Sequence, residues 1–413
     1  MAKQTIDRID VSGKRVFVRA DFNVPIEDGV IGDDRRIRMT IPTIRSVLRR
    51  GGSVVAASHL GRPEGRGFEA EFSLAPVRER LATLLGADAP AGVAMGGRSC
   101  VDAESAAAAK ALKPGHVLLL ENLRFEKGEK KGDAALAASL ASLADVYCND
   151  AFGASHRNDA SMLALPLAMK PKPCVAGLLL AKELKYLSET LQKPEHPFVA
   201  IVGGAKVSDK LLALRNLLGR VDAILVGGAM AYTFLLSRGH SVGKSLVQRD
   251  MVTEAGAILS EAASRGTRIL LPLDHVCGAE LKEGTPTQTV AGDIPDGLMG
   301  LDVGPATEAT FSAEVARARM VVWNGPLGAF ETTPFQHGTF ALAAAVARAT
   351  QAGGCTSIAG GGDTAAAVEA AGVAAAFSHI STGGGASLEM LEGKRFDSLE
   401  PLLDDAMAGA ARA

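Results

Sequence analysis

The 413-residue sequence predicts an α/β protein of two domains, each built on a parallel sheet with helices on both faces. Short β-branched runs alternate with longer segments rich in Ala and Leu almost throughout the chain, and apolar strands separated by helices are typical of parallel sheets. The length exceeds what one hydrophobic core usually serves, which indicates two domains. A proline-rich stretch near the middle, residues 166–197, indicates where they divide.

The apolar runs predict the strands in chain order. In the first half we expect them within RVFVRADFNVP (15–25), SVVAASHLGRP (53–63), HVLLLENLRF (116–125) and DVYCNDAFG (145–153). In the second half we expect them within FVAIVGG (198–204), AILVGG (223–228), RILLPLDHV (268–276), MVVWNGPLGAF (320–330) and CTSIAGGG (355–362). Because Ala is the best helix former, the Ala-rich tracts at 103–111, 134–144, 341–349 and 365–376 are expected to be helices.

The domain boundary is predicted from a helical segment between two proline-containing stretches. Residues 178–192 (LLLAKELKYLSETLQ) have helical periodicity, and KPEHP (193–197) ends it. We expect 1–177 to form an N-terminal domain, 178–193 a connecting helix, and 194–399 a C-terminal domain. The alternative is that this helix is simply the last of the first domain.

Composition excludes several classes of function. Lys and Arg (44) nearly balance Asp and Glu (46), so no overall basic charge attracts nucleic acid or an anionic membrane. The five cysteines are scattered without a CxxC pair, which argues against a zinc site or a disulfide framework. No stretch approaches the ~18 apolar residues of a membrane span, and the N-terminus lacks the apolar core of a signal peptide. We therefore expect a soluble, cytoplasmic protein.

The second half repeats one pattern four times: an apolar strand, two or three glycines, then a helix. Helix N-termini present unpaired amides and a partial positive charge, and glycine lets phosphate oxygens approach them. Together with Lys206 and Lys210, such turns predict a polyphosphate site. The alternative is that the glycines only permit tight turns. The pattern occurs in AIVGGAKVSDKLLALRNLL, ILVGGAMAYTFLLSRG, SIAGGGDTAAAVEAAG and ISTGGGASLEMLEG.

The first half has basic and amide side chains where the second half has glycines. Arginine forks match carboxylate and phosphate oxygens, and the ends of parallel strands lie at one edge of the sheet. This pattern predicts a site for a small, multiply charged anion, although any single arginine is more often a solvated surface charge. The residues concerned are Arg19, Asp21, Asn23, Arg36, His59, Arg62, Asn122, Arg124, His156 and Arg157.

Other motifs are weaker. GHSVGKS (239–245) is one residue short of a P-loop and follows a predicted helix rather than a strand. GGGDTA (360–365) satisfies GxGxxA, but no carboxylate follows about 20 positions on to hold a ribose, so a dehydrogenase is the second candidate. A noncatalytic nucleotide-binding protein would not need the arginines. No HExxH or EF-hand pattern is present.

Seven segments, taken in order and spacing over the whole chain, resemble the phosphoglycerate kinase family: VRADFNVP, SHLGRP, LLLENLRF, VGGAKVSDK, VWNGPLGAFE, IAGGGDT and STGGGASLE. The resemblance implies two Rossmann-like domains facing each other across a cleft with a helical hinge. It also implies that residues 400–413 pack back on the first domain. The implied reaction is reversible phosphoryl transfer from 1,3-bisphosphoglycerate to MgADP, giving 3-phosphoglycerate and MgATP after domain closure, in a monomer with small-molecule partners only.

The resemblance also implies residue roles, position by position. For the acid substrate these are Arg19, Asp21, Phe22, Asn23, Arg36, His59, Leu60, Gly61, Arg62, Arg124 and Arg157. For the nucleotide they are Gly204, Lys206, Lys210, Gly227, Gly228, Asn324, Pro326, Glu331, Gly360, Gly361, Gly362, Asp363 and Thr364, with Asp363 reaching Mg²⁺. The glycine turn Gly383, Gly384 and Gly385 faces the transferred phosphoryl group, and the implied catalytic residues are Arg36, Lys206, Gly383 and Gly384.

One position departs from the family pattern. Where the family commonly has HRAHAS, this chain has HRNDAS (156–161), so that Asp159 replaces a histidine. A carboxylate beside a basic site is expected to weaken binding of an acidic substrate unless its side chain turns away.

Overall fold

The computed structural model describes residues 2–189 and 192–405. The chain divides into two compact units, one of residues 1–185 together with 395–413 and one of residues 186–394. The division lies inside the expected connecting helix, whose described part is α6 (Leu178–Leu184) followed by a π-helical turn (Lys185–Glu189). Residues 190–191 of that predicted helix lie outside the described residues.

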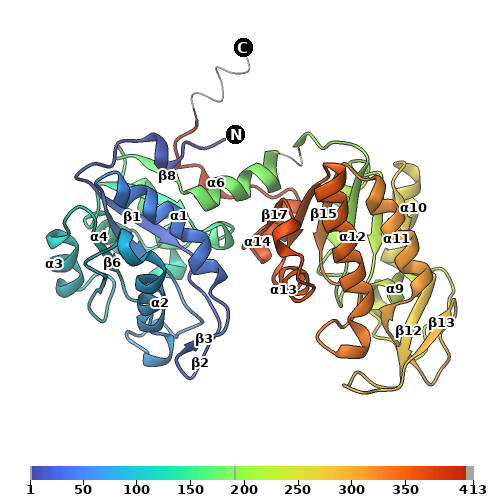
Figure 1. Ribbon diagram of the computed structural model, residues 1–413. Coiled ribbons are helices and arrows are strands. Elements are labelled where there is room, and N and C mark those ends of the chain that lie inside the picture. Colours follow the sequence, from blue (N-terminus) through green and yellow to red (C-terminus); the bar gives the residue numbers. More distant parts are fainter. Residues whose placement is uncertain (1, 190–191, 406–413) are drawn as a thin grey trace, which may run out of the picture. The chain divides into compact units, whose positions relative to one another are not determined.

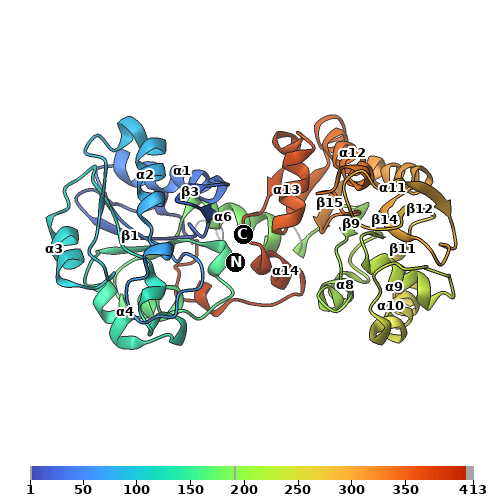
Figure 2. The same cartoon turned by 90° about the horizontal axis from the view of Figure 1, so that it is seen from below.

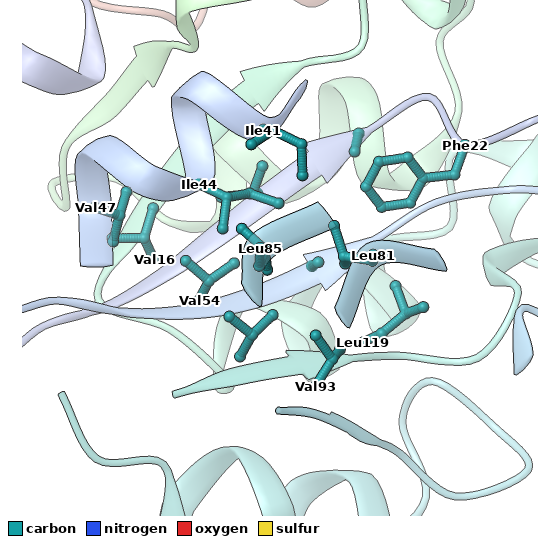
Figure 3. Close-up of a cluster of buried hydrophobic side chains, with 14 of the residues drawn as sticks. Val16, Phe22, Ile41, Ile44, Val47, Val54, Leu81, Leu85, Val93 and Leu119 are labelled. Carbon is teal, nitrogen blue, oxygen red and sulfur yellow. The ribbon is translucent and has the colours of Figure 1, made fainter. Parts of the chain in front are cut away.

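The first unit contains a six-stranded parallel sheet in the order β5-β6-β4-β1-β7-β8. Helices α1 (Arg35–Arg49) and α2 (Ala75–Leu85) cover one face of this sheet (Figure 3), and α4 (Ala134–Ala141) lies on the other (Figure 2). The strands are β1 (Arg15–Ala20), β4 (Ser53–Ala57), β5 (Val93–Met95), β6 (Val117–Leu119), β7 (Val146–Asp150) and β8 (Cys174–Ala176). The remaining regular elements are α3 (Ala103–Ala111), α5 (Leu165–Ala168) and the hairpin of β2 (Ile26–Glu27) and β3 (Val30–Ile31).

The second unit contains another six-stranded parallel sheet, in the order β11-β10-β9-β15-β16-β17. Helices α11 (Pro305–Arg317) and α12 (His337–Gly353) lie on one side of it and α8 to α10 on the other (Figure 2). The strands are β9 (Phe198–Val202), β10 (Ala223–Val226), β11 (Arg268–Leu270), β15 (Met320–Asn324), β16 (Thr356–Gly360) and β17 (His379–Ile380). The other helices are α8 (Leu211–Leu217), α9 (Met230–Ser237), α10 (Val252–Ser264), α13 (Gly362–Ala370) and α14 (Gly385–Leu391).

Burial on both faces explains why the strands read as continuous apolar runs. Val16 and Val54 pack under α1 and α2, while their neighbours Phe17 and Val55 are equally buried on the opposite face. Trp323 in β15 is fully buried within the core beneath α11 and α12. This arrangement confirms the predicted parallel sheets, which are drawn in Figure 1.

The segment RILLPLDHV differs from expectation. We expected one strand, but β11 ends at Leu270 and β12 (Asp274–Gly278) belongs to a separate antiparallel sheet with β13 (Gln288–Ala291) and β14 (Met299–Val303). Pro272 lies between the two strands, and proline cannot donate to a strand ladder. The purely parallel expectation for the second half is therefore wrong here.

The Ala-rich tracts are helical, and two of the helices end earlier than expected. Tract 103–111 forms α3, α4 ends at Ala141 within tract 134–144, and tract 341–349 lies within α12. The fourth helix, α13, ends at Ala370, because Gly372 has a φ of 71° and the chain continues in a separate 3₁₀ turn, Ala374–Ala376.

The C-terminal segment is tied to the first unit through backbone hydrogen bonds. Leu403 N donates to Cys174 O at 2.8 Å, and Leu403 O accepts from Gln4 N at 2.8 Å. The rest of the segment expected to pack there, 406–413, lies outside the described residues. Among the described helices, none has the length and hydropathy needed to cross a membrane.

Candidate functional site

The polar residues of the first unit follow the carboxyl ends of neighbouring strands. β1 lies between β4 and β7, so the strand order reverses beside it, and such a switch point is where ligands bind in open α/β sheets. Asp21 and Asn23 follow β1, His59 follows β4, Arg124 follows β6 and Arg157 follows β7. The fold therefore gathers predicted residues that are up to 138 positions apart (Arg157 against Arg19) at one edge of the sheet.

His59 lies among the arginines. Its side chain is 2% exposed, with Nδ1 at 3.3 Å from Nη2 of Arg19 and Nε2 at 3.5 Å from Nη1 of Arg157. Burial, followed by the positive charges of Arg19, Arg124, Arg157 and Arg36, holds the pKa of His59 well below its usual range. His59 is therefore neutral at physiological pH, and the positive charge around it belongs to the guanidinium groups.

Arg36, in the first turn of α1, is held by the loop after β1. Its Nη1 donates to Asn23 O at 2.7 Å and lies 3.5 Å from Asp21 Oδ1. Asn23 Oδ1 in turn accepts from Gly61 N at 2.8 Å, which links this loop to the one after β4. Asp21 and Asn23 thus orient a guanidinium rather than add a free charge to the edge.

Arg124 is the most buried arginine at this edge after Arg19. It is 8% exposed, its Nη1 donates to Gly61 O at 2.6 Å, and its Nε is buried with no hydrogen-bond partner among the described residues. Burial and then repulsion from Arg157 lower the pKa of Arg124. Arg62 is exposed and makes no hydrogen bond or ion pair within the described chain.

Two residues predicted for this site contribute mainly to the core. Phe22 is fully buried and points toward the side chains beneath α1 (Figure 3), and Leu60 is 4% exposed. Their side chains pack into the core and so stabilise the loops after β1 and β4. The sequence pattern gave no way to separate these two functions, because both residues lie inside the matching motifs.

Sequence reasoning missed two buried polar residues behind the arginines. Glu129 is fully buried, its Oε1 and Oε2 accept from the hydroxyl and backbone N–H of Ser161, and that hydroxyl accepts from Nε of Arg19. Burial raises the pKa of Glu129, while Arg19 opposes the rise. Glu129 lies in the charged run EKGEKKGD, which is typical of a solvated surface, so no local pattern indicates its burial.

The glycines of the second unit fall into two groups. Those directly after β9, β10 and β15 are packed against backbone: a Cβ at Gly203 would lie 2.0 Å from Pro326 O, and one at Gly228 would lie 2.5 Å from Gly204 N. A Cβ at Gly227 would likewise lie 2.3 Å from Cδ2 of Leu327. Close packing of three strand ends accounts for these glycines, which is the alternative that the sequence left open.

The glycines after β16 and β17 are different. A Cβ at Gly362 or Gly385 would meet no atom within 4 Å, and both residues are exposed at the start of a helix, α13 and α14 respectively. Gly361 and Gly384 have φ values of 93° and 51°, which favour glycine for conformational reasons. Here the backbone amides border open space, as a phosphate site requires.

A polar chain joins the strand ends of this second edge. Lys210 Nζ donates to Asn324 Oδ1, and Asn324 Nδ2 donates to Gly360 O at 3.0 Å. Thr364 Oγ1 accepts from Gly325 N at 2.7 Å, which ties the start of α13 to the loop after β15. Burial lowers the pKa of Lys210, whereas the charge of Asp363 opposes this.

The remaining predicted nucleotide residues are open to solvent. Lys206, Glu331 and Asp363 are exposed, while Pro326 is half-buried and its carbonyl accepts from Gly204 N at 3.2 Å. Gly383 is buried, and its N–H donates to Ser381 Oγ at 3.0 Å. Within the described ranges no group of three or more His, Cys, Asp or Glu is placed to hold a metal by itself.

The GHSVGKS segment has none of the geometry of a P-loop. Lys244 N donates to Leu298 O at 2.7 Å and Ser245 Oγ accepts from Gly300 N at 2.9 Å, so the segment is paired with the loop before β14 and with that strand. It does not join a strand to a helix, which confirms its exclusion.

Comparisons with known proteins agree over nearly the whole chain. The family model "Phosphoglycerate kinase" matches residues 6–394. A phosphoglycerate kinase of Rhodopirellula baltica is 51% identical over 410 residues, which cover 98% of this chain and 100% of that one. One from Moorella thermoacetica is 50% identical over 405 residues, covering 98% of this chain and all of the relative.

Solved structures show the same likeness. Phosphoglycerate kinase from Coxiella burnetii has a TM-score of 0.86 at 39% identity and covers 97% of this chain and 98% of its own. The enzyme from Pyrococcus horikoshii OT3 has a TM-score of 0.82 at 28% identity, with the same coverage of 97% and 98%.

Proposed function

Because the chain belongs to the phosphoglycerate kinase family, we propose that its two polar strand-end edges are the two halves of that enzyme's active site. The protein is a kinase that transfers a phosphoryl group between 1,3-bisphosphoglycerate and ADP. We assign the acid substrate to the first edge and the nucleotide to the second. The observation that carries this assignment is chemical: one edge presents guanidinium groups around a neutral His59, and the other presents backbone amides at open glycines.

The reaction needs little proton chemistry from the protein. In the direction of ATP use, a carboxylate oxygen of 3-phosphoglycerate forms a bond to the γ-phosphorus while the bond to the β,γ-bridging oxygen of ATP breaks. The carboxylate is already ionised at neutral pH, so no general base is required. What the protein must supply is alignment and neutralisation of charge on the transferred PO₃ unit.

The proposed contributions follow from what each residue contacts. Arg36, oriented by Asn23, and the exposed Lys206 neutralise the phosphoryl oxygens, and the amides of Gly383 and Gly384 complete their surroundings. Arg62, Arg124 and Arg157 bind the acid. The sets named from the sequence are otherwise retained as proposed ligand contacts.

We propose Mg²⁺ as the ion that accompanies the nucleotide. Asp363 is an exposed carboxylate in the first turn of α13, beside the open space at Gly362. Mg²⁺ is commonly held by one or two carboxylates together with phosphate oxygens and water, so a lone carboxylate fits this donor set. When bound with the nucleotide, the ion supplies positive charge to the phosphate oxygens.

Trp323 offers a test of the metal assignment, because it is the single tryptophan and directly precedes Asn324. We expect Asp363→Asn to weaken MgADP binding on the order of tenfold, while ADP binding in EDTA changes by less than about twofold. Fluorescence titration of Trp323 measures both. Asp296→Asn, an exposed carboxylate in the loop before β14, is the matched control. An equal loss of ADP affinity with Mg²⁺ and in EDTA would contradict the assignment.

We further propose that the two units close on each other during the reaction. The residues assigned to the acid belong to one unit and those assigned to the nucleotide belong to the other, so direct transfer requires them to meet. Closure would also exclude water, which would otherwise take the phosphoryl group. Small-angle X-ray scattering should show a smaller radius of gyration with 3-phosphoglycerate and a nonhydrolysable MgATP analogue together than with either alone. An unchanged radius with both ligands would argue against closure.

Asp159 is expected to reduce the affinity for the acid substrate. It is 5% exposed, its Oδ2 has no hydrogen-bond partner among the described residues, and its charge acts on Arg124. Asp159→Asn should therefore lower the KM for 3-phosphoglycerate by about two- to fivefold, since it removes a negative charge from an anion site. The KM for ATP serves as the internal control. A higher KM for the acid would mean that Asp159 orients Arg124 more than it repels substrate.

We also propose that the enzyme is a monomer of the cytoplasm, without nucleic-acid or membrane partners. The five cysteines are free and buried, and the formal charge of −2 is close to neutral. Light scattering of the purified protein tests the monomer.

A further inference from the structure

A buried chain of polar contacts runs from Glu129 to His59. Ser161 Oγ donates to Glu129 Oε1 at 2.6 Å, and Ser161 N donates to Oε2 at 3.0 Å. Arg19 Nε donates to the same hydroxyl at 2.8 Å, and Arg19 Nη2 lies 3.3 Å from His59 Nδ1. Glu129, Ser161 and Arg19 are fully buried, so water does not compete for these groups.

The direction of every hydrogen in this chain is fixed by chemistry. An ionised carboxylate only accepts, so the Ser161 hydroxyl must point its hydrogen at Glu129 and accept from Arg19. Burial raises the pKa of Glu129, and the opposite charge of Arg19 limits that rise. The Ser161 hydroxyl accepts from Arg19 in either protonation state of Glu129, because Arg19 Nε can only donate. Arginine only donates, so Arg19 Nη2–H can pair with Nδ1 of His59 only if that nitrogen carries no hydrogen. A neutral imidazole then carries its hydrogen on Nε2.

The second arginine at His59 competes with this arrangement. Nη1 of Arg157 lies 3.5 Å from Nε2 and is also a donor. It can pair with Nε2 only in the other tautomer, with the hydrogen on Nδ1. The two arginines therefore favour opposite tautomers. Arg19 determines which one forms, because it lies closer to His59 than Arg157 does and is held in place by Ser161.

We propose that Glu129 and Ser161 are positioning residues which, through Arg19, hold His59 as its Nε2–H tautomer, so that Nε2 donates a hydrogen bond to the anionic acid substrate. This inference depends on the proposed assignment of His59 to the acid site. It gives a function to a buried carboxylate that touches no substrate.

Two variants test this chain of polar contacts, one at Ser161 and one at Glu129. Ser161→Ala removes the acceptor of Arg19 Nε. Glu129→Gln keeps the size of the side chain. If the amide oxygen of the glutamine accepts from Ser161 N, its NH₂ group faces the Ser161 hydroxyl, which already accepts from Arg19. Both variants weaken the hold on Arg19, whose Nη1 still donates to Ala20 O, so that Arg157 competes better for the lone pair of Nε2.

The direct measurement is the tautomer itself. Long-range ¹H–¹⁵N NMR of protein labelled at its eight histidines reports which ring nitrogen carries the hydrogen, and His59→Gln identifies the His59 signals. We expect a single Nε2–H tautomer in the wild type and a mixture in Ser161→Ala and Glu129→Gln. The KM for 3-phosphoglycerate should rise about tenfold in both variants, with kcat and the KM for ATP changed by less than about threefold.

Ser105→Ala is the matched control. The Ser105 hydroxyl is also buried, donating to Ser99 O at 2.7 Å and accepting from Gly97 N at 2.9 Å, but it lies in α3 outside this chain of contacts. It should destabilise the fold to a similar degree without altering the His59 signals or any KM.

The outcomes separate this inference from the site assignment. An Nδ1–H tautomer in the wild type overturns the inference, whether or not any variant folds. An unchanged tautomer in a folded Ser161→Ala or Glu129→Gln protein overturns it as well. If His59→Gln leaves the KM for 3-phosphoglycerate unchanged, the assignment of His59 to the acid site fails instead.

Discussion

Replacing Lys206 with alanine is expected to lower kcat by about 10²- to 10³-fold while the Kd for ADP changes by less than about threefold. Lys206 lies in the loop after β9, is exposed, and has no hydrogen bond or ion pair within the described chain. Its charge is therefore not committed to holding the fold. In our proposal it pairs with phosphoryl oxygens only as they move between substrates, so its removal costs transition-state stabilisation rather than nucleotide binding.

Two other lysines make this prediction specific. Lys210 is half-buried and bound to Asn324, so Lys210→Ala should weaken nucleotide binding and loosen the loops after β9 and β15. Lys244, in the P-loop-like GHSVGKS segment, is exposed, and Lys244→Ala should leave kcat and every KM unchanged. Steady-state kinetics with both substrates varied, together with fluorescence titration of ADP, distinguish the three. A normal kcat in Lys206→Ala would remove this residue from the mechanism.

The elements that sequence predicts best are those set by local pattern. Continuous apolar runs such as 198–202 become buried strands because both faces of the sheet are covered, and the Ala-rich tract 103–111 forms α3 over the predicted range. The separate antiparallel sheet was missed because β12 and β14 are paired by tertiary contacts, which no short-range periodicity records. Pro272 was the one local signal for that break.

The candidate site divides in the same manner. Residues at strand ends, such as His59 and Asp363, can be predicted because they directly follow apolar runs that are visible in the sequence. The contacts between site residues cannot be predicted in this way, because the partners are distant in sequence. Lys210 and Asn324 are 114 positions apart, and Ser161 and Glu129 are 32 apart. Lys210 and Asn324 meet because β9 and β15 are neighbours in the sheet, whereas Ser161 and Glu129 meet because the turns that follow β7 and β6 pack together. A buried carboxylate also looks like a surface charge until its surroundings are known, as Glu129 illustrates.

Replacing Arg36 with alanine should lower kcat by about 10²- to 10³-fold, with a smaller rise in the KM for 3-phosphoglycerate. Arg36 is the one guanidinium of this edge carried by α1, and Asn23 O and Asp21 Oδ1 fix its direction. A side chain oriented in advance loses little entropy when the phosphoryl group arrives, which is the condition for stabilising a transition state. Arg62, exposed and without such partners, should contribute mainly to binding, so Arg62→Ala should mainly raise the KM for the acid.

Two matched variants determine whether the Arg36 effect is geometric. Arg38 is on the same helix but is paired with Asp34 at 2.6 Å, and Arg38→Ala should leave kcat unchanged. Arg36→Lys keeps the charge but loses the planar fork that reaches Asn23 O and a phosphoryl oxygen together. If the lysine variant retains most of the wild-type kcat, charge alone is sufficient. A loss close to that of alanine means that the orientation imposed by the loop after β1 is what the reaction requires.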